Sequence, residues 1–302
     1  MYSFSTCWNA DRHTDGREML REIRRLGFEY AELSHNTRIS LVPGIIEAVE
    51  AGEIKISSLH NFCPLPIGTD PAAPDTFKLS DPRAQYRALA VQHTKKTIEL
   101  AARLKARAVV LHLGALEIKD YTHRLVQLAG RGLRGSAQFV RLCVEANRAL
   151  HSKTAAVMQR VCEGLNELLK YAETFGVKLA AENRESLDLL PADNDLPSLF
   201  QQFPQLGYWH DTGHGQIKEN IGFIHNAYQL ELLQQQLIGM HIHDVQFPAR
   251  DHRQPGTGTV DFGALRPAVP TNVIKVFEFS STLTPDEVKA GIAHVKSIFG
   301  FD

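Results

Sequence analysis

The chain has 302 residues, of which 43% are hydrophobic, and its formal net charge is −1 at pH 7. This length suffices for one large core and suits a (β/α)8 barrel, which commonly needs roughly 250 residues or more. The near-neutral charge excludes the global positive field of a protein that binds a phosphate backbone, so nucleic acid is not an expected partner.

The cysteines and the N-terminal residues indicate a reduced protein without a membrane segment. Cys7, Cys63, Cys143 and Cys162 form no CxxC pair, which argues against a disulfide scaffold or a zinc knuckle. The first residues, MYSFSTCWNADRH, contain no basic segment followed by an apolar run, and no stretch reaches the roughly 20 apolar residues of a membrane span. We therefore expect a soluble, cytoplasmic protein.

Short apolar runs alternate with longer segments of helical period along the whole chain, which is typical of β-α units around a parallel sheet. Eight runs are predicted as strands: residues 2–6, 30–34, 55–61, 108–114, 178–183, 207–211, 238–244 and 275–279. No GxGxxG follows the first run, so a closed barrel is favoured over an open, doubly wound sheet. The prediction is an α/β protein with a single (β/α)8 TIM-barrel domain over residues 1–302.

The helix ends carry recognisable signals. The sequence TPDE at 284–287 combines a capping box with proline at the first helical position. Gly27, Gly52 and Gly176 stand where three of the helices should stop.

Two segments are too long to be simple connections. Residues 63–80 follow the third strand and contain four prolines, which predicts a semi-rigid flap over the C-terminal mouth of the barrel. Residues 115–148 predict an extra, partly helical insertion after the fourth strand. From Lys119 to Arg160 the chain has eight Lys or Arg residues against Asp120 and Glu145 alone. This charge could meet an anionic substrate or a neighbouring subunit in a homo-oligomer, or it could be a solvated helix face.

Polar residues interrupt the apolar runs at their C-terminal ends, where a parallel barrel builds its active site. The third to eighth strands end in SSLHNF, VVLHLG, LAAENRE, YWHDTGH, GMHIHDV and VFEFS. The candidates they supply are His60, His112, Glu182, Asp211, His214, His241, His243, Asp244 and Glu278.

A carboxylate in an apolar run such as VFEFS is costly to bury alone. Glu182, Asp211 and Glu278, together with one histidine of the seventh strand, would converge from four late strands as a mostly oxygen-donor site with three negative charges. One divalent cation, Mn²⁺, Mg²⁺, Co²⁺ or Zn²⁺, compensates such a site most simply. Strand alternation places His241 and His243 on the same face, so the pattern alone does not choose between them.

Other interpretations compete with this one. A single histidine at a strand end, such as His60, His112 or His243, is more often a hydrogen-bonded core residue than a ligand. His210 should point away from the site and pack against a helix. Further polar or aromatic residues near strand ends could bind hydroxyls or stack on a sugar face: Trp8, Asn9, Asn61, Asn183, Arg184 and Trp209.

Taken together, these motifs resemble the xylose isomerase-like TIM-barrel superfamily, which contains sugar-phosphate isomerases and epimerases, inosose dehydratases and the endonuclease IV type of apurinic-site nuclease. The resemblance spans nearly the whole chain. It is carried by LGFEYAEL, LHLG, AENRE, DTGH, HIHD, DHRQPGTGTVDF and FEFS.

The ketose epimerases of this superfamily bind one divalent cation through Glu, Asp, His and Glu of strands five to eight. The resemblance therefore implies Glu182, Asp211, His241 and Glu278 as ligands, with His241 preferred to His243. It also implies that Glu182 and Glu278 act as acid and base on opposite faces of the substrate. It implies as well that His214 contacts the substrate near its carbonyl. With the polar residues at strand ends, the candidate substrate-binding residues are His60, His112, His214, Arg184, Trp209 and His252.

The nuclease branch holds three zinc ions through further histidines, and His60, His112, His214 and His252 match several of them. A second metal on His60, His112 and His214 is thus an alternative. Arg250, however, occupies the place of an aspartate ligand of the third zinc, and only the adjacent Asp251 could substitute for it.

The expected function is therefore isomerisation or epimerisation of a sugar or polyol, phosphorylated or free, by proton abstraction next to a carbonyl through an enediolate. The alternatives are a dehydratase of the same superfamily and a zinc-dependent abasic-site endonuclease.

Overall fold

The computed structural model describes residues 1–69 and 76–300. Eight parallel strands close into a barrel in the order β1-β12-β9-β8-β6-β4-β3-β2. These strands are β1 (Tyr2–Ser5), β2 (Tyr30–Leu33), β3 (Lys55–His60), β4 (Ala108–Leu111), β6 (Lys178–Glu182), β8 (Gly207–Asp211), β9 (Leu237–Ile242) and β12 (Ile274–Phe277). The predicted (β/α)8 barrel is confirmed, and each strand falls on one of the eight predicted runs.

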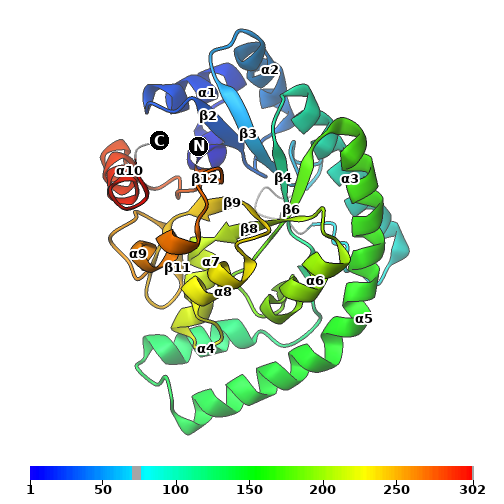
Figure 1. Cartoon of the computed structure of the whole chain (residues 1–302), viewed down its shortest axis with the longest axis vertical. Coiled ribbons are helices and arrows are strands. Elements are labelled where there is room, and N and C mark those ends of the chain that lie inside the picture. Colours follow the sequence, from blue (N-terminus) through cyan, green and yellow to red (C-terminus); the bar gives the residue numbers. More distant parts are fainter. Residues whose placement is uncertain (70–75, 301–302) are drawn as a thin grey trace.

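Helices surround the barrel strands (Figure 1). They are α1 (Gly16–Arg25), α2 (Val42–Glu50), α3 (Ala84–Arg103), α4 (Tyr121–Gly130), α5 (Ala137–Phe175), α6 (Leu196–Gln202), α7 (Thr212–Asn220), α8 (Asn226–Leu233), α9 (Phe262–Leu265) and α10 (Pro285–Phe299). The predicted capping box is present at Thr284 and Glu287, and Gly176 ends α5 in the left-handed conformation at φ 67°. Within the described residues, no helix has the length and apolar character needed to cross a membrane.

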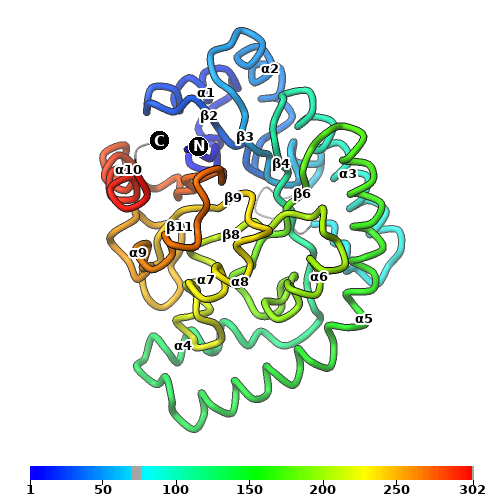
Figure 2. Tube along the Cα trace, viewed as in Figure 1, coloured from blue at the N-terminus to red at the C-terminus, as the bar shows by residue number. Residues whose placement is uncertain are grey.

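The barrel closes where the beginning and the end of the chain meet. Strand β1 pairs with β12, with Tyr2 opposite Lys275, and the Tyr2 hydroxyl donates a hydrogen bond to the Gly300 carbonyl at 2.9 Å. The trace in Figure 2 accordingly brings the first strand and α10 close together. Apolar side chains fill the space between strands and helices, and a separate apolar cluster around Trp209 and Val276 fills the barrel interior.

Short antiparallel strand pairs follow several barrel strands on the side of their carboxyl ends. β5 (Gly114–Ala115) pairs with β7 (Leu189–Leu190), and β10 (Asp244–Gln246) pairs with β11 (Arg250–Arg253). The loops after β4, β6 and β9 are therefore held by backbone hydrogen bonds.

The predicted insertion after the fourth strand has no boundary near residue 148. Helix α5 runs unbroken over 39 residues, so its N-terminal half belongs to the insertion and its C-terminal half is a barrel helix (Figure 1). The segment contains no proline and a single glycine, Gly164, so nothing in it stops a helix. Helix α4 packs on the N-terminal half in a second apolar cluster that also includes Leu187 and Ile221. Of the predicted flap, residues 70–75 lie outside the described residues.

Candidate metal centre

Four predicted ligands meet at the carboxyl ends of four adjacent strands. Glu182 ends β6, Asp211 ends β8, His241 lies in β9 and Glu278 directly follows β12. Each offers one ligand atom, and these atoms all lie within 4.8 Å of one another. His241 Nδ1 is 2.6 Å from Glu182 Oε1, 3.3 Å from Glu278 Oε2 and 3.7 Å from Asp211 Oδ2. We call these four residues the deep cluster.

The deep cluster gathers three buried carboxylates around one imidazole. Burial opposes ionisation of Glu182 and Glu278, yet His241 in particular holds the pKa of each well below its usual range. Burial also opposes ionisation of Asp211, but His214 and His243 lower its pKa to about 2. Burial disfavours the imidazolium of His241, whereas Glu278, Glu32 and Glu182 raise its pKa well above the ordinary value. This excess of buried negative charge and oxygen donors fits a divalent cation.

The orientation of His241 depends on a residue that the sequence reading missed. Glu32 of β2 is fully buried, and its Oε1 lies 3.0 Å from His241 Nε2. The Ser58 hydroxyl donates to the other Glu32 oxygen at 2.7 Å. His241 therefore donates from Nε2 to Glu32 and turns Nδ1 toward the three carboxylates, the arrangement in which an outer carboxylate fixes a metal-binding histidine. A carboxylate within the apolar run YAEL is the same signal that identified Glu278, so it could have been found.

His243 has a different role from His241, although it also lies near the carboxylates. The backbone N–H of His252 donates to His243 Nδ1 at 3.0 Å, so the ring proton must be on Nε2. That nitrogen lies 3.0 Å from Asp211 Oδ2 and donates to it. His243 thus has no free lone pair for a cation and instead holds Asp211 in place. This is a structural reason to prefer His241 as the ligand.

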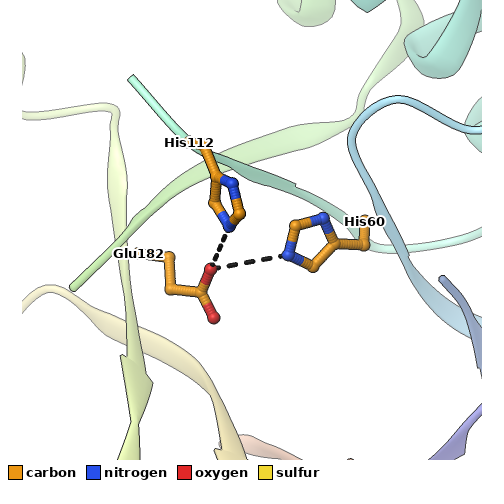
Figure 3. A group of neighbouring side chains, drawn as sticks. All are labelled: His60, His112 and Glu182. Carbon is orange, nitrogen blue, oxygen red and sulfur yellow. Dashed lines mark hydrogen bonds and ion pairs between the residues drawn. The ribbon is translucent and has the colours of Figure 1, made fainter. Parts of the chain in front are cut away.

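Two further histidines converge on the second oxygen of Glu182 (Figure 3). His112, which follows β4, has its Nε2 2.8 Å from Glu182 Oε2, and Nε2 of His60, the last residue of β3, is 3.5 Å from the same oxygen. The two rings meet edge to face with centroids 4.7 Å apart. Glu182 therefore connects the deep cluster to this histidine pair.

His214 and His252 also lie near the site. The His214 backbone N–H donates to Asp211 Oδ1 at 2.7 Å, because Asp211 caps the N-terminus of α7. His214 Nε2 lies 3.6 Å from Oε2 of Glu185, a second residue that the sequence reading missed. His252 Nε2 lies 3.6 Å from Glu278 Oε2. We call His60, His112, His214 and His252 the outer histidines.

Arg184 is close to the site and buried, with Nε 3.3 Å from Glu185 Oε2. Trp209 is not placed as expected. Its ring is fully buried in the apolar cluster of the barrel interior and contacts His241 edge to face at 5.3 Å. Trp209 lies on the same inner face of β8 as Asp211, one layer deeper, and supports His241 from the core side; its role in substrate binding stays a prediction.

The weaker candidates near strand ends have structural partners. Trp8 donates from Nε1 to the Leu283 carbonyl at 2.9 Å. Asn61 Nδ2 donates to Thr94 Oγ1, and Asn9 Nδ2 donates to the Met19 carbonyl. Asn183 bridges β6 and β8, because its side chain both accepts from and donates to the Asp211 backbone. His210 points away from the site, as expected, and pairs with the Tyr208 hydroxyl at 2.8 Å.

A family model described as xylose isomerase-like TIM barrel matches residues 20–297. An uncharacterized protein of Methanocaldococcus jannaschii is 24% identical over 288 residues, which cover 94% of this chain and 92% of that protein. The solved structure of a D-tagatose 3-epimerase-like protein superposes with a TM-score of 0.67 at 17% identity, over 98% of both chains.

Two further solved structures are similar over nearly their whole length. A D-psicose 3-epimerase from Clostridium cellulolyticum H10 has a TM-score of 0.66 at 12% identity, over 99% of both chains. A 3-keto-D-glucoside 4-epimerase from E. coli has a TM-score of 0.67 at 15% identity, over 98% of both chains. At these identities the likeness establishes a common fold.

Proposed function

Because the chain belongs to the xylose isomerase-like TIM barrel family, we propose that it is a divalent-metal-dependent isomerase or epimerase of a sugar or polyol. The observation that carries this proposal is the deep cluster, which places three carboxylates and one imidazole within reach of one ion at the active-site end of the barrel. Two of the similar solved structures are sugar epimerases, which supports the same substrate class.

Glu182, Asp211, His241 and Glu278 would hold Mn²⁺, Mg²⁺, Co²⁺ or Zn²⁺, the ions that suit this donor set. A bound ion of this kind supplies Lewis acidity, which acidifies the carbon between a substrate carbonyl and an adjacent hydroxyl.

Glu182 and Glu278 are the two proton-transfer groups of the proposed reaction. They stand on β6 and after β12, at the two ends of the four-strand arc β12-β9-β8-β6, and therefore approach a substrate from two sides. Burial works against their ionisation, but His241 holds the pKa of both well below the usual range, so both are ionised and able to accept a proton. One takes the proton from the substrate carbon to give an enediolate. The other, protonated from water before this step, gives its proton to the opposite face, and proton exchange with water then restores both carboxylates.

The outer histidines and Arg184 would bind substrate oxygens. His112 and His60 face Glu182, and His252 faces Glu278, so each proton-transfer carboxylate has an imidazole beside it. These donors would orient hydroxyl groups next to the carbon that reacts.

The test combines metal analysis with isotope exchange. Protein purified without chelator is expected to contain about one divalent metal per chain. Incubated in D₂O with a panel of ketoses, inososes and 3-keto sugars, it is expected to incorporate deuterium at one carbon of its substrate. A metal-loaded protein that exchanges no carbon-bound hydrogen in any of these compounds would contradict the proposal. Loss of water from an inosose would instead identify a dehydratase, which shares the same enediolate.

A specific observation favours a second candidate, an abasic-site endonuclease. His60, His112 and Glu182 form one group of close ligand atoms, and Asp211, His214 and His243 form another. Three zinc ions per chain, with nicking of abasic duplex DNA, would support this candidate. The hydrogen bond that commits His243 Nδ1 to the His252 backbone argues against the second group, and Arg250 on β11 is an exposed cation rather than an anionic ligand.

A further inference from the structure

Asp244, at the start of β10, is a fully buried carboxylate outside the deep cluster. Its Oδ1 accepts hydrogen bonds from the backbone N–H groups of Val245 at 2.8 Å and Val260 at 3.0 Å. Its Oδ2 accepts from Gly256 and Gly258, both at 2.9 Å. Three of the four donors belong to residues 254–260, so this loop is folded around one side chain. Four donors around one carboxylate form a strong, charge-assisted set of hydrogen bonds.

The loop lies so close to Asp244 that one position must be glycine. A Cβ atom added to Gly258 would stand 2.4 Å from Asp244 Oδ1 and 2.3 Å from the Val245 carbonyl oxygen, distances that no side chain tolerates. Asp244 also pairs in register with Arg253 of β11, the strand that leads into the loop. Asp244 is thus joined to the segment that follows His252 in two ways: its backbone pairs with Arg253, and its carboxylate binds Gly256, Gly258 and Val260.

His252 connects this segment to the candidate active site. Its φ is 52°, in the left-handed region that non-glycine residues seldom occupy. Its backbone N–H donates to His243 Nδ1, and its carbonyl accepts from the Ser280 N–H, both at 3.0 Å. Its ring stacks on His243 at 4.2 Å, which brings Nε2 to 3.6 Å from Glu278 Oε2. These bonds to His243 and Ser280 hold His252 in its unfavourable backbone conformation, and the loop that Asp244 binds begins two residues further along the chain.

We propose that Asp244 is a positioning residue: by tying loop 254–260 to β10 it fixes His252 beside Glu278. The placement of His252 is independent of any activity, whereas its catalytic consequence rests on the proposed function. In Asp244→Asn the amide nitrogen replaces one acceptor oxygen, so two of the four backbone donors lose their partner.

The first test follows the loop by hydrogen–deuterium exchange of the full chain. Asp244→Asn is expected to raise amide exchange in residues 254–260 by about tenfold or more, because those amides lose charged acceptors, while the barrel strands stay protected. Asp261→Asn is the matched control, since Asp261 is exposed and its side chain accepts from the Ala264 N–H at 2.9 Å. Equal exchange in the two variants, or faster exchange throughout the barrel in Asp244→Asn, would overturn the proposal.

The second test follows His252 directly by NMR of isotope-labelled histidine, with the signal assigned by its loss in His252→Asn. Asp244→Asn is expected to shift the ring signal of His252, and Asp261→Asn is not. Gly258→Ala keeps the carboxylate but forces the loop away from it, so it should shift the same signal even if Asp244→Asn folds poorly. An unshifted His252 signal in folded Asp244→Asn or Gly258→Ala would refute the positioning role.

The third test measures turnover on the substrate found by the isotope screen. Asp244→Asn and His252→Asn are expected to lower kcat, and the double variant should be no slower than His252→Asn alone, because both changes remove the same interaction. Fully additive losses would refute the positioning role. If the unmodified protein exchanges no substrate hydrogen, the proposed function fails. The amide-exchange and NMR tests of the protein then still decide the role of Asp244.

Discussion

The deep cluster and the outer histidines differ in the elements that carry them. Every member of the deep cluster lies in a barrel strand or directly after one, and its side chains are at most 7% exposed. Of the outer histidines, His60 and His112 are at the ends of β3 and β4, His214 is on helix α7, and His252 is on the hairpin strand β11 and 31% exposed. The barrel thus fixes the groups that would hold a cation together with His60 and His112, and leaves His214 and His252 on more variable supports.

The largest effect is expected from removing a deep carboxylate. Glu278→Gln keeps the shape of the side chain but removes its charge and its capacity to accept a proton, so turnover should fall by about 10³-fold or more. Steady-state kinetics on the identified substrate, with circular dichroism to check the fold, would measure this loss. Glu287→Gln, which changes an exposed carboxylate at the N-terminus of α10, is the control. Retained activity in Glu278→Gln would refute its role as an essential base and ligand.

Removing the support of the deep cluster should have a smaller effect. Glu32→Gln weakens the hydrogen bond that orients His241, so we expect the affinity for Mn²⁺ to fall about 10–100-fold while the barrel stays folded. Isothermal titration calorimetry of the chelator-treated protein would measure the change. Glu29→Gln removes an exposed carboxylate three residues earlier and should leave the affinity unchanged. An unchanged affinity in Glu32→Gln would mean that Glu32 only fills the core.

The stability of the metal-free protein and its affinity for metal should depend on pH in opposite directions. Burial opposes protonation of His241, but Glu278, Glu32 and Glu182 raise its pKa well above the ordinary value of about 6.5. The stability that this raised pKa contributes to the metal-free protein is fully present below pH about 6.5 and is lost as the pH rises through the folded-state pKa. A cation needs the neutral ring, so its binding releases a proton and becomes tighter as the pH rises.

We therefore expect the melting temperature of chelator-treated protein to fall as the pH is raised above about 6.5, while its affinity for Mn²⁺ rises by up to about tenfold per pH unit. Thermal melts and metal titrations over the same pH series would show both trends. His294→Gln, which removes an exposed histidine of α10, should keep them. A metal affinity independent of pH would show that His241 is already neutral in the metal-free protein.

The deep cluster was predictable from sequence because each residue breaks an apolar strand with a charge at the end that forms the site. Glu32 gives the same signal on β2. It was missed because its segment, LGFEYAEL, was interpreted as a family motif and not as an apolar strand with a buried carboxylate. The sequence placed Trp209 near a strand end but did not give its depth: residues 209 and 211 share one face of β8, and Trp209 lies a layer below Asp211 in the barrel interior. The single helix over residues 137–175 is consistent with its local sequence, which has no proline and one glycine, whereas the folding of loop 254–260 around Asp244 depends on tertiary packing, which no local pattern contains.

The smallest effect is expected in the outer histidines, and it separates one bound metal from several. His112 Nε2 makes one hydrogen bond to Glu182, so its loss in His112→Gln should change turnover by less than about tenfold if the histidine only orients substrate and Glu182. The metal content per chain should then stay the same, as measured by elemental analysis of the purified variant. His123→Gln, on the exposed face of α4, is the control. A variant that loses one metal ion per chain would instead show that His60, His112 and Glu182 hold a second ion, as the nuclease candidate requires.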